Sequence, residues 1–364
     1  MLREDRRRRL VDEMAKAGID ALLVYGNAWQ GDYLRYAADF GILEGHGLAL
    51  ITKDGIELYL DSATELERAE AETQGLALVL APDIARAVAA RLDRIANHRL
   101  AAAPWRFMPR FLAEKARGFS LADGTAFLDR LLMHKLPGEI DALRRAARLA
   151  DEGYAVFRKS AIPGRRQFEL CAAVEAFLRA QGCADNFMIL GSGGRDVLGM
   201  TPPSDRIIAT GDLVTTELTP AVEGYYAQIC RTLVVGKASE AQKRAHALYL
   251  EALEAGVAAV RPGATAADVA RAENDVFRKY GLGDYVTDRY TRVRGHGLGL
   301  FADSKPHILE DVETELRAGM VLVVHPNTYH PEIGYMVLGD AVVVTETGAE
   351  VLIKTPRVLF EMGA

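Results

Sequence analysis

The chain has 364 residues, of which 49% are hydrophobic and 26% are charged, and this balance is typical of a folded globular protein. The length is sufficient for two domains, each with a core of its own. A net charge of -6 provides no broad basic surface, so we expect no nucleic-acid partner, and the composition suggests no membrane span.

The cysteines and the first residues of the chain both indicate the cellular compartment of the protein. Cys171, Cys183 and Cys230 are odd in number and lack the paired spacing of a metal site, which favours reduced thiols and a cytoplasmic location. The basic run Arg6–Arg9 is not followed by the apolar segment of a signal peptide. Apolar residues follow it at helical spacing from Leu10, so we predict that these arginines form the solvated face of a first helix.

A short apolar run, residues 21–25, predicts a buried strand after this helix. A helix followed by a strand is typical of the start of an α/β domain. Two further apolar runs, 48–51 and 56–60, flank an Asp54-Gly55 turn and predict a β-hairpin.

Between these strands, residues 29–36 mix aromatic and polar side chains without a clear amphipathic period. One interpretation is a loop and a short helix that packs its aromatic rings inward. The other is that Trp29, Tyr33 or Arg35 contacts a substrate. The residues by themselves leave both interpretations open.

A domain boundary is predicted at residues 136–140, where Pro and Gly interrupt the helical pattern before a long helix resumes. We therefore expect an amino-terminal domain over residues 1–133 and a second domain over residues 134–364. Apolar spacing predicts further helices of the second domain over residues 168–180, 240–260 and 265–280.

Two predicted strands of the second domain carry polar side chains. One holds Glu217, and its hairpin partner covers residues 224–236. Because side chains alternate along a strand, Tyr226, Gln228 and Cys230 are expected to share one face. Polar groups on one strand face indicate a binding or catalytic surface.

The most distinctive segment is Arg292–Pro306, in which three alternating glycines surround His296. We interpret the glycines as removing side chains that would crowd the imidazole, which leaves it accessible. A later apolar run, residues 320–327, predicts a buried strand that leads to His325. Histidine transfers protons near neutral pH and its neutral form also binds metals, so the pattern predicts a site without naming its reaction.

The order of these motifs resembles the pita-bread superfamily. The similarity is carried by Glu217 in its strand, Gly-His296-Gly-Leu-Gly-Leu, His325-Pro326 and Gly339-Asp340, and it covers the whole second domain. That superfamily includes methionine aminopeptidase, prolidase, Xaa-Pro aminopeptidase, ectoine hydrolase and creatinase, and the amino-terminal domain suits its prolidase and creatinase branch. The resemblance implies an α+β protein in which a small α/β domain precedes a pita-bread catalytic domain.

The resemblance also implies a homodimer in which the amino-terminal domain of one subunit borders the site of the other. Under this expectation Trp29, Tyr33 and Arg35 contact the substrate in trans. The expected ligand is a small-molecule substrate, with no nucleic acid and no membrane as partner.

The metal-ligand set of the superfamily is only partly present. Its metallopeptidases hold two metal ions with two aspartates, one histidine and two glutamates, and the resemblance places Glu217, Gln228, His296, His325 and Gly339 at these positions. An amide and a glycine at the bridging positions cannot supply the anionic oxygen ligands that two divalent ions need. We therefore do not expect a dinuclear site.

Creatinase is the precedent for a metal-free member, so the first expectation is a metal-independent hydrolase of a small polar amide, urea, guanidine or cyclic amidine. His296 or His325 would act as the general base or acid, and Glu217 would orient an imidazole or activate water. Burial beside Glu217 is expected to favour a charged imidazole. Gln228 would donate its amide N–H to a developing oxyanion.

Four more residues are candidate substrate contacts. Tyr226 would be a phenolic donor, and Arg231 and Arg292 would bind a substrate carboxylate, although each arginine also suits a structural ion pair. Asp303 stands where the resemblance implies a peptidase histidine.

Two alternatives stay open at this point. Glu217, His296 and His325 form a two-histidine, one-carboxylate set that could bind one divalent transition-metal ion in a Xaa-Pro peptidase-like hydrolase or lyase. The other alternative is a non-catalytic binding protein with this fold.

Overall fold

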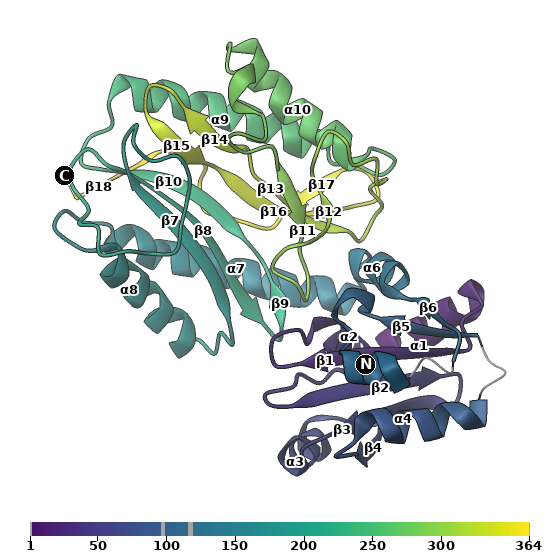
Figure 1. Cartoon of the computed structure of the whole chain (residues 1–364). Coiled ribbons are helices and arrows are strands. Elements are labelled where there is room, and N and C mark those ends of the chain that lie inside the picture. The colour runs from purple at the N-terminus through teal and green to yellow at the C-terminus, as the bar shows by residue number, and fades with distance from the viewer. Residues whose placement is uncertain (1, 96–98, 116–118, 364) are drawn as a thin grey trace. The chain divides into compact units, whose positions relative to one another are not determined.

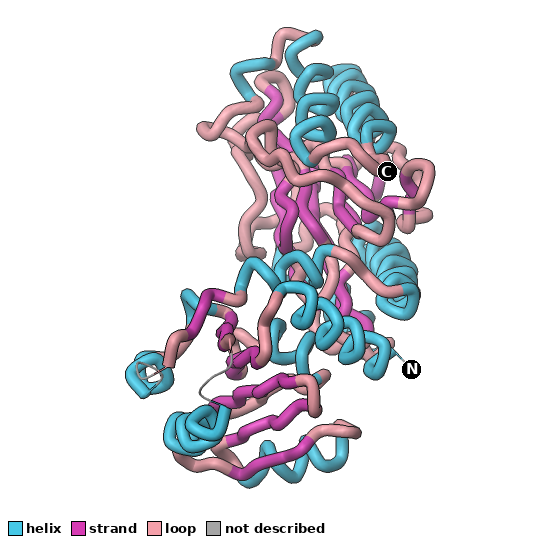
Figure 2. Tube along the Cα trace, turned by 90° about the vertical axis from the view of Figure 1, so that its right-hand side faces the viewer, coloured by secondary structure: helices cyan, strands magenta, loops and turns pink. Residues whose placement is uncertain are grey.

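The structure is a computed structural model that describes residues 2–95, 99–115 and 119–363. The chain forms two compact units, Met1–Leu132 and Met133–Ala364 (Figure 1). The first unit is a mixed α/β structure, and the second is a curled and mostly antiparallel sheet with helices (Figure 2), so the predicted fold class is confirmed. Among the described residues, no helix is both long and apolar enough to cross a membrane.

The first unit is built on a six-stranded sheet with strand order β4-β3-β2-β1-β5-β6. β1 pairs antiparallel with β2 and parallel with β5, and β2 pairs with β3 around the turn at Gly55. The predicted buried strand and hairpin are therefore confirmed. The strands are β1 (Ala21–Asn27), β2 (His46–Thr52), β3 (Gly55–Leu60), β4 (Ala77–Leu80), β5 (Leu100–Ala103) and β6 (Leu121–Asp123).

Short helices connect these strands. Ser62 and Asp83 begin two of them as N-caps, because each side chain accepts a hydrogen bond from a backbone N–H of the first turn. The helices are α1 (Leu2–Ala17), α2 (Asp32–Ala38), α3 (Ala63–Glu72), α4 (Ile84–Leu92), α5 (Arg110–Lys115) and α6 (Thr125–Met133), with 3-10 turns at Asp93–Ile95 and Trp105–Phe107.

The first helix differs from the sequence prediction at one position. Arg6 is 2% exposed, and its guanidinium lies 2.5 Å from the carboxylate of Asp39. The prediction of a solvated arginine face was therefore wrong for Arg6, because helix α1 turns this side chain toward α2 and its carboxyl end.

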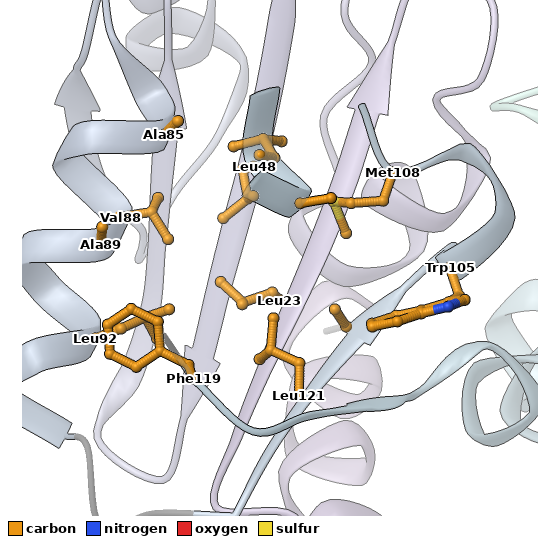
Figure 3. Close-up of a pocket in the computed structure, with 13 residues that line it drawn as sticks. Leu23, Leu48, Ala85, Val88, Ala89, Leu92, Trp105, Met108, Phe119 and Leu121 are labelled. Atoms are coloured by element: carbon orange, nitrogen blue, oxygen red, sulfur yellow. The ribbon is translucent and has the colours of Figure 1, made fainter. Parts of the chain in front are cut away.

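An apolar cavity of about 320 Å³ lies inside the first unit (Figure 3). Val88 and Leu92 of α4 point toward Leu23 and Leu48 of the sheet across this cavity. These four side chains are buried members of the hydrophobic core. The cavity is therefore a loosely filled part of that core, lined mainly by apolar side chains.

The second unit is organised by a ten-stranded sheet whose main path is β12-β11-β13-β16-β10-β8-β7. All pairs along this path are antiparallel, and β18 adds to β10 in parallel. The strands are β7 (Asn186–Gly193), β8 (Leu213–Val222), β9 (Tyr225–Tyr226), β10 (Ile229–Val235), β11 (Gly295–Gly297), β12 (Ser304–His307), β13 (Val321–Val324), β14 (Asn327–His330), β15 (Gly334–Val337), β16 (Gly339–Val344), β17 (Ala349–Val351) and β18 (Phe360–Met362).

Two pairs of helices pack on this sheet (Figure 1). α7 packs beside α8 and against β8, whereas α9 packs beside α10 and against β13. Thr265 caps α10 by accepting a hydrogen bond from the N–H of Asp268, as its position in the sequence suggests. The helices are α7 (Pro137–Ser160), α8 (Gln167–Ala180), α9 (Glu240–Ala259) and α10 (Ala266–Lys279), with a 3-10 turn at Gly283–Tyr285.

One predicted strand is interrupted in the structure, and residues 334–344 also form two strands. These are β15, which pairs with β14, and β16, which pairs with β10 and β13. The run 224–236 is broken at residues 227–228, but the amide nitrogen of Gln228 still lies 3.3 Å from Sγ of Cys230, so these two side chains share a face. A strand pattern in the sequence shows which residues are extended, but the available partner strands decide where pairing stops.

Candidate functional site

A cavity of about 350 Å³ in the second unit contains most of the predicted catalytic residues. The structure brings together five side chains that the sequence analysis selected: Glu217, Gln228, His296, Asp303 and His325. Apolar side chains line the same cavity, among them Phe187, Ile189 and Val293. Asn327 and Tyr335 also line it, and the sequence analysis missed both.

Tight backbone packing positions His296. β11 lies between β12 and β13, and a Cβ atom added at Gly295 would lie 2.0 Å from the carbonyl oxygen of Val323. A Cβ atom at Gly297 would lie 2.2 Å from the carbonyl oxygen of Lys305. The glycines are therefore required by the neighbouring backbones, and His296 is buried rather than openly accessible as the sequence suggested.

The hydrogen bonding of His296 sets its tautomer. Its Nδ1 lies 3.1 Å from the carbonyl oxygen of Gly297, and because a carbonyl oxygen can only accept, Nδ1 carries the proton. The Nε2 lone pair of neutral His296 is then available to accept a proton. Burial lowers the pKa of His296, and the nearby carboxylate of Asp303 offsets this effect in part.

His325 is also neutral at physiological pH. Burial, followed by repulsion from His296, lowers the pKa of His325 to about 3. The two imidazole rings meet edge to face, with centroids 5.5 Å apart. The expectation of a charged imidazole beside Glu217 was therefore wrong, because burial lowers the pKa of both imidazoles and outweighs the opposite effect of the Asp303 carboxylate on His296.

Glu217 is the titrating group of the cavity. Burial and the negative charge of Asp303 raise its pKa to about 7, although the side-chain amides of Asn327 and Gln228 oppose this shift. A carboxyl group that titrates near neutral pH can both accept and donate a proton there. Glu217 thus combines the position and the pKa of a general acid or base.

Asp303 connects the cavity to a histidine that the sequence analysis missed. Its Oδ1 lies 3.0 Å from Nε2 of His307 and 3.8 Å from Nδ1 of His296. His296 and His307 are paired across β11 and β12. Asp303 and His307 are four residues apart in the chain, so their contact is local, but no pattern in the sequence indicates it.

Asn327 is supported from behind by a buried arginine. The guanidinium of Arg294 donates to the backbone oxygens of Asn327 and Thr291, each at 2.8 Å, and to the side chain of Asn274 at 2.5 Å. Arg294 is fully buried and stacks over the ring of Phe277. It fixes the backbone that follows His325 without lining the cavity.

Three predicted substrate contacts do not line this cavity. The hydroxyl of Tyr226 donates to Asp185 at 2.5 Å, and Arg292 forms exposed ion pairs with Asp288 and Asp311. Arg231 is fully buried. These placements favour structural roles over substrate binding for the three residues.

Arg231 joins the sheet to the carboxyl-terminal segment. Its guanidinium lies 2.7 Å from the carboxylate of Asp340 and donates to the backbone oxygens of Gly339 and Thr355 at 2.7 and 2.8 Å. Both members of the ion pair are buried. Arg231 therefore holds the backbone of β16, next to the cavity, in place.

Trp29, Tyr33 and Arg35 belong to the first unit. Trp29 is 93% exposed, and the hydroxyl of Tyr33 donates to Asp129 at 2.6 Å. The expected role of these residues in the site of a partner subunit stays a prediction, as does the homodimer itself.

Comparison with known proteins identifies the family of this chain. The pattern of metallopeptidase family M24 matches residues 141–346, and that of the creatinase/prolidase N-terminal domain matches residues 6–133. The chain belongs to metallopeptidase family M24. Its second unit is therefore a pita-bread domain, as the motifs around Glu217 and His296 indicate.

The similar proteins are mostly dipeptidases by name. The Xaa-Pro dipeptidase of Pyrococcus furiosus is 34% identical over 227 residues, which are 62% of this chain and 64% of that protein. The match thus spans less than two thirds of this relative. Among solved structures, the Xaa-Pro dipeptidase from Bacillus anthracis has a TM-score of 0.86 at 26% identity and covers 99% of this chain and 100% of its own. The prolidase from Pyrococcus furiosus has a TM-score of 0.81 at 27% identity and covers 95% of this chain and 99% of its own.

These findings overturn the first functional expectation. A hydrolase of small ureas, guanidines or amidines was inferred from the missing metal ligands, whereas the relatives are Xaa-Pro dipeptidases of a metallopeptidase family. The physical reason for the error is that metal ligands determine how a bond is activated. They do not determine which bond the cavity accepts, because that depends on the shape of the whole site.

The residues present do not fit the two-ion centre that the family name suggests. Gln228 offers a neutral amide, and Gly339 has no side chain. A Cβ atom added at Gly339 would lie 2.4 Å from Cβ of His325, so His325 occupies the space that a side chain at 339 would need. Within the described ranges, no three His, Cys, Asp or Glu side chains are grouped to hold an ion. The names of the relatives nevertheless favour the Xaa-Pro peptidase alternative over the metal-independent hydrolase of ureas, guanidines or amidines.

We predict that Gly339→Ala destabilises the protein by about 1–3 kcal/mol, because the added methyl group overpacks against His325. Chemical denaturation of the purified variant measures this change. Gly348→Ala is the matched control, since a Cβ atom there would meet no atom within 4 Å. Equal stability of the two variants would show that the space beside His325 is open.

We predict that Arg231→Met lowers the free energy of unfolding by about 3 kcal/mol. The buried carboxylate of Asp340 keeps its ion pair with Arg357 but loses Arg231, and the backbone oxygens of Gly339 and Thr355 lose a donor. Arg292→Met removes exposed ion pairs and is expected to change stability by less than about 1 kcal/mol. Urea denaturation of both variants makes the comparison. A small effect at Arg231 would contradict its structural role.

Proposed function

We propose that this chain hydrolyses small peptides of the Xaa-Pro dipeptide kind in the cavity of its second unit. The observation that carries the proposal is Glu217, a carboxyl group with a pKa of about 7 in a cavity that also holds two neutral imidazoles. A volume of about 350 Å³ is within the range of small-ligand sites and is suited to a dipeptide. The names of the similar dipeptidases support the same substrate class.

The roles of the residues follow from their protonation states. Ionised Glu217 takes a proton from the attacking water, and in its protonated form it returns a proton to the leaving nitrogen. Nε2 of His296 accepts a hydrogen bond from the water or from the substrate N–H, because Nδ1 donates to Gly297. The amide of Gln228 and the hydroxyl of Tyr335 are donors within the same lining and can stabilise the developing oxyanion.

The apolar lining supports a substrate with a proline ring. Phe187, Ile189, Met200 and Val293 provide hydrophobic surface in the cavity that holds the reacting groups. Burial of the ring against this surface would hold the peptide bond near Glu217.

We predict that the rate of Xaa-Pro dipeptide hydrolysis rises with pH around a midpoint near 7. Glu217 must be ionised to act as the base, and its carboxyl group loses its proton as the pH passes its pKa. The pH profile of kcat/KM for alanyl-proline, with and without added Mn²⁺ or Co²⁺, measures this.

Glu217→Gln is expected to lower kcat by about 10²–10⁴-fold, whereas Glu251→Gln on the exposed face of α9 is the control. A wild-type protein that hydrolyses no Xaa-Pro peptide, with or without these ions, would refute the proposed function. Activity retained by Glu217→Gln would refute the role of this carboxylate.

We also predict that Glu217→Gln stabilises the protein at pH 8 but not at pH 4. The folded-state pKa of about 7 lies above the usual value of 4.5, so the folded protein binds this proton more tightly than the unfolded chain. The stabilisation from this proton is complete below about pH 4.5 and is lost as the pH rises through 7. The difference corresponds to about 3 kcal/mol. Denaturation curves of both proteins at the two pH values measure it.

A further inference from the structure

The apolar cavity of the first unit has a lining that is almost free of polar side-chain atoms. Its volume is about 320 Å³, and the lining comes from the sheet, from α4 and from the segment 105–121. Among the described lining residues, the indole nitrogen of Trp105 is the one side-chain nitrogen or oxygen. Figure 3 shows this nitrogen on the side of the ring that points away from Leu23 and Leu48. The described lining therefore presents hydrocarbon and sulfur surface to the cavity.

Water is a poor occupant of such a cavity. A buried water molecule needs about two to four polar partners. The backbone offers few of them, because β1 is paired with β2 on one side and with β5 on the other, and the backbone of α4 is hydrogen-bonded within the helix. An empty cavity would leave the surrounding side chains without van der Waals partners. An apolar molecule would supply these contacts without the loss of a hydrogen bond.

The cavity reaches the surface at Trp105. This residue lines the cavity, yet it is 45% exposed. Phe107 and Phe111 of the same segment are 52% and 41% exposed. The segment is held in place at its start, because the backbone N–H of Trp105 donates to the hydroxyl of Thr125 at 2.8 Å. A small hydrophobic molecule can therefore pass from the exposed rings into the cavity along the indole.

We propose that this cavity is a binding site for a small, uncharged aromatic molecule, separate from the cavity that contains Glu217. The lining excludes a charged ligand, because none of its described side chains carries a charge that would replace the lost hydration. Dry apolar cavities of about half this volume bind a molecule of the size of benzene, so the space suits a bicyclic ring system. The site belongs to the first unit and does not depend on the proposed peptidase activity.

The side chains at the two ends of the cavity favour an aromatic ligand over an aliphatic one. Trp105 and Phe119 lie at opposite ends in Figure 3, with Leu23 and Leu121 between them. Aromatic rings attract one another in offset-stacked and edge-to-face arrangements. The thioether of Met108 adds a sulfur atom, which contacts the edges of aromatic rings favourably. A planar ring system between the two ends thus meets aromatic surface at both of them.

The test compares two ligands of the same shape. Indene is a bicyclic hydrocarbon, and benzimidazole has rings of the same size with two ring nitrogens. Calorimetry at pH 8 measures the affinity of the wild-type protein for each. We expect indene to bind and to raise the melting temperature, because it stabilises the folded state. Benzimidazole is expected to bind at least tenfold more weakly, since its nitrogens would be buried without partners.

Two alanines of α4 provide matched variants. Ala89 lines the cavity, whereas Ala90 of the same helix is exposed. Ala89→Leu places a larger side chain in the cavity and is expected to weaken indene binding at least tenfold. Ala90→Leu is expected to retain the wild-type affinity. Ala85→Leu fills the cavity from the preceding turn of α4 and provides the same test if Ala89→Leu does not fold.

The variants also separate this site from the cavity of the second unit, which has some apolar lining of its own. Indene binding that survives the filling of the first cavity would place the ligand elsewhere and overturn the inference. Failure of the wild-type protein to bind indene, or equal affinity for indene and benzimidazole, would overturn it as well. None of these measurements requires peptide hydrolysis, so the proposed function and this inference can fail independently.

Discussion

The close approach of three backbones at β11 is the constraint on which the site depends. Gly295 and Gly297 leave room for the carbonyl oxygens of Val323 and Lys305, and any larger residue would push the strands apart. This packing fixes His296 between them and brings His307 of β12 across from it. The geometry around His296 is thus a property of strand packing.

Burial then decides the charge state of each group in the cavity. It keeps His296 and His325 neutral, and together with Asp303 it brings the pKa of Glu217 close to neutral pH. Asp303 lies further out and stays ionised because His307 supports it. The cavity therefore contains a proton-transfer group inside and a fixed negative charge at its edge, and the first of these features leads to the proposed chemistry.

The family match implies a centre with two metal ions, but Gln228 and Gly339 stand at positions where such a centre needs carboxylates. The structure is consistent with both observations. The strands, helices and cavity of a metallopeptidase domain are retained, since they depend on core packing and strand pairing. Gly339 leaves no room for a ligand side chain, because an added Cβ atom would lie 2.4 Å from Cβ of His325 and 2.8 Å from the carbonyl oxygen of Val324.

The sequence by itself determined the helices, the central strands, the two-part fold and five of the residues that line the cavity, because these features follow from apolar periodicity and from short motifs. It did not reveal Asn327, Tyr335 or His307, and it assigned substrate contacts to Tyr226 and Arg231, which bind other parts of the protein. The contacts of Tyr226 with Asp185 and of Arg231 with Asp340 join residues that are distant in the chain, so they depend on the tertiary structure. The protonation states were likewise decided by the tertiary structure, because burial sets the cost of a charge and only the folded chain shows what is buried.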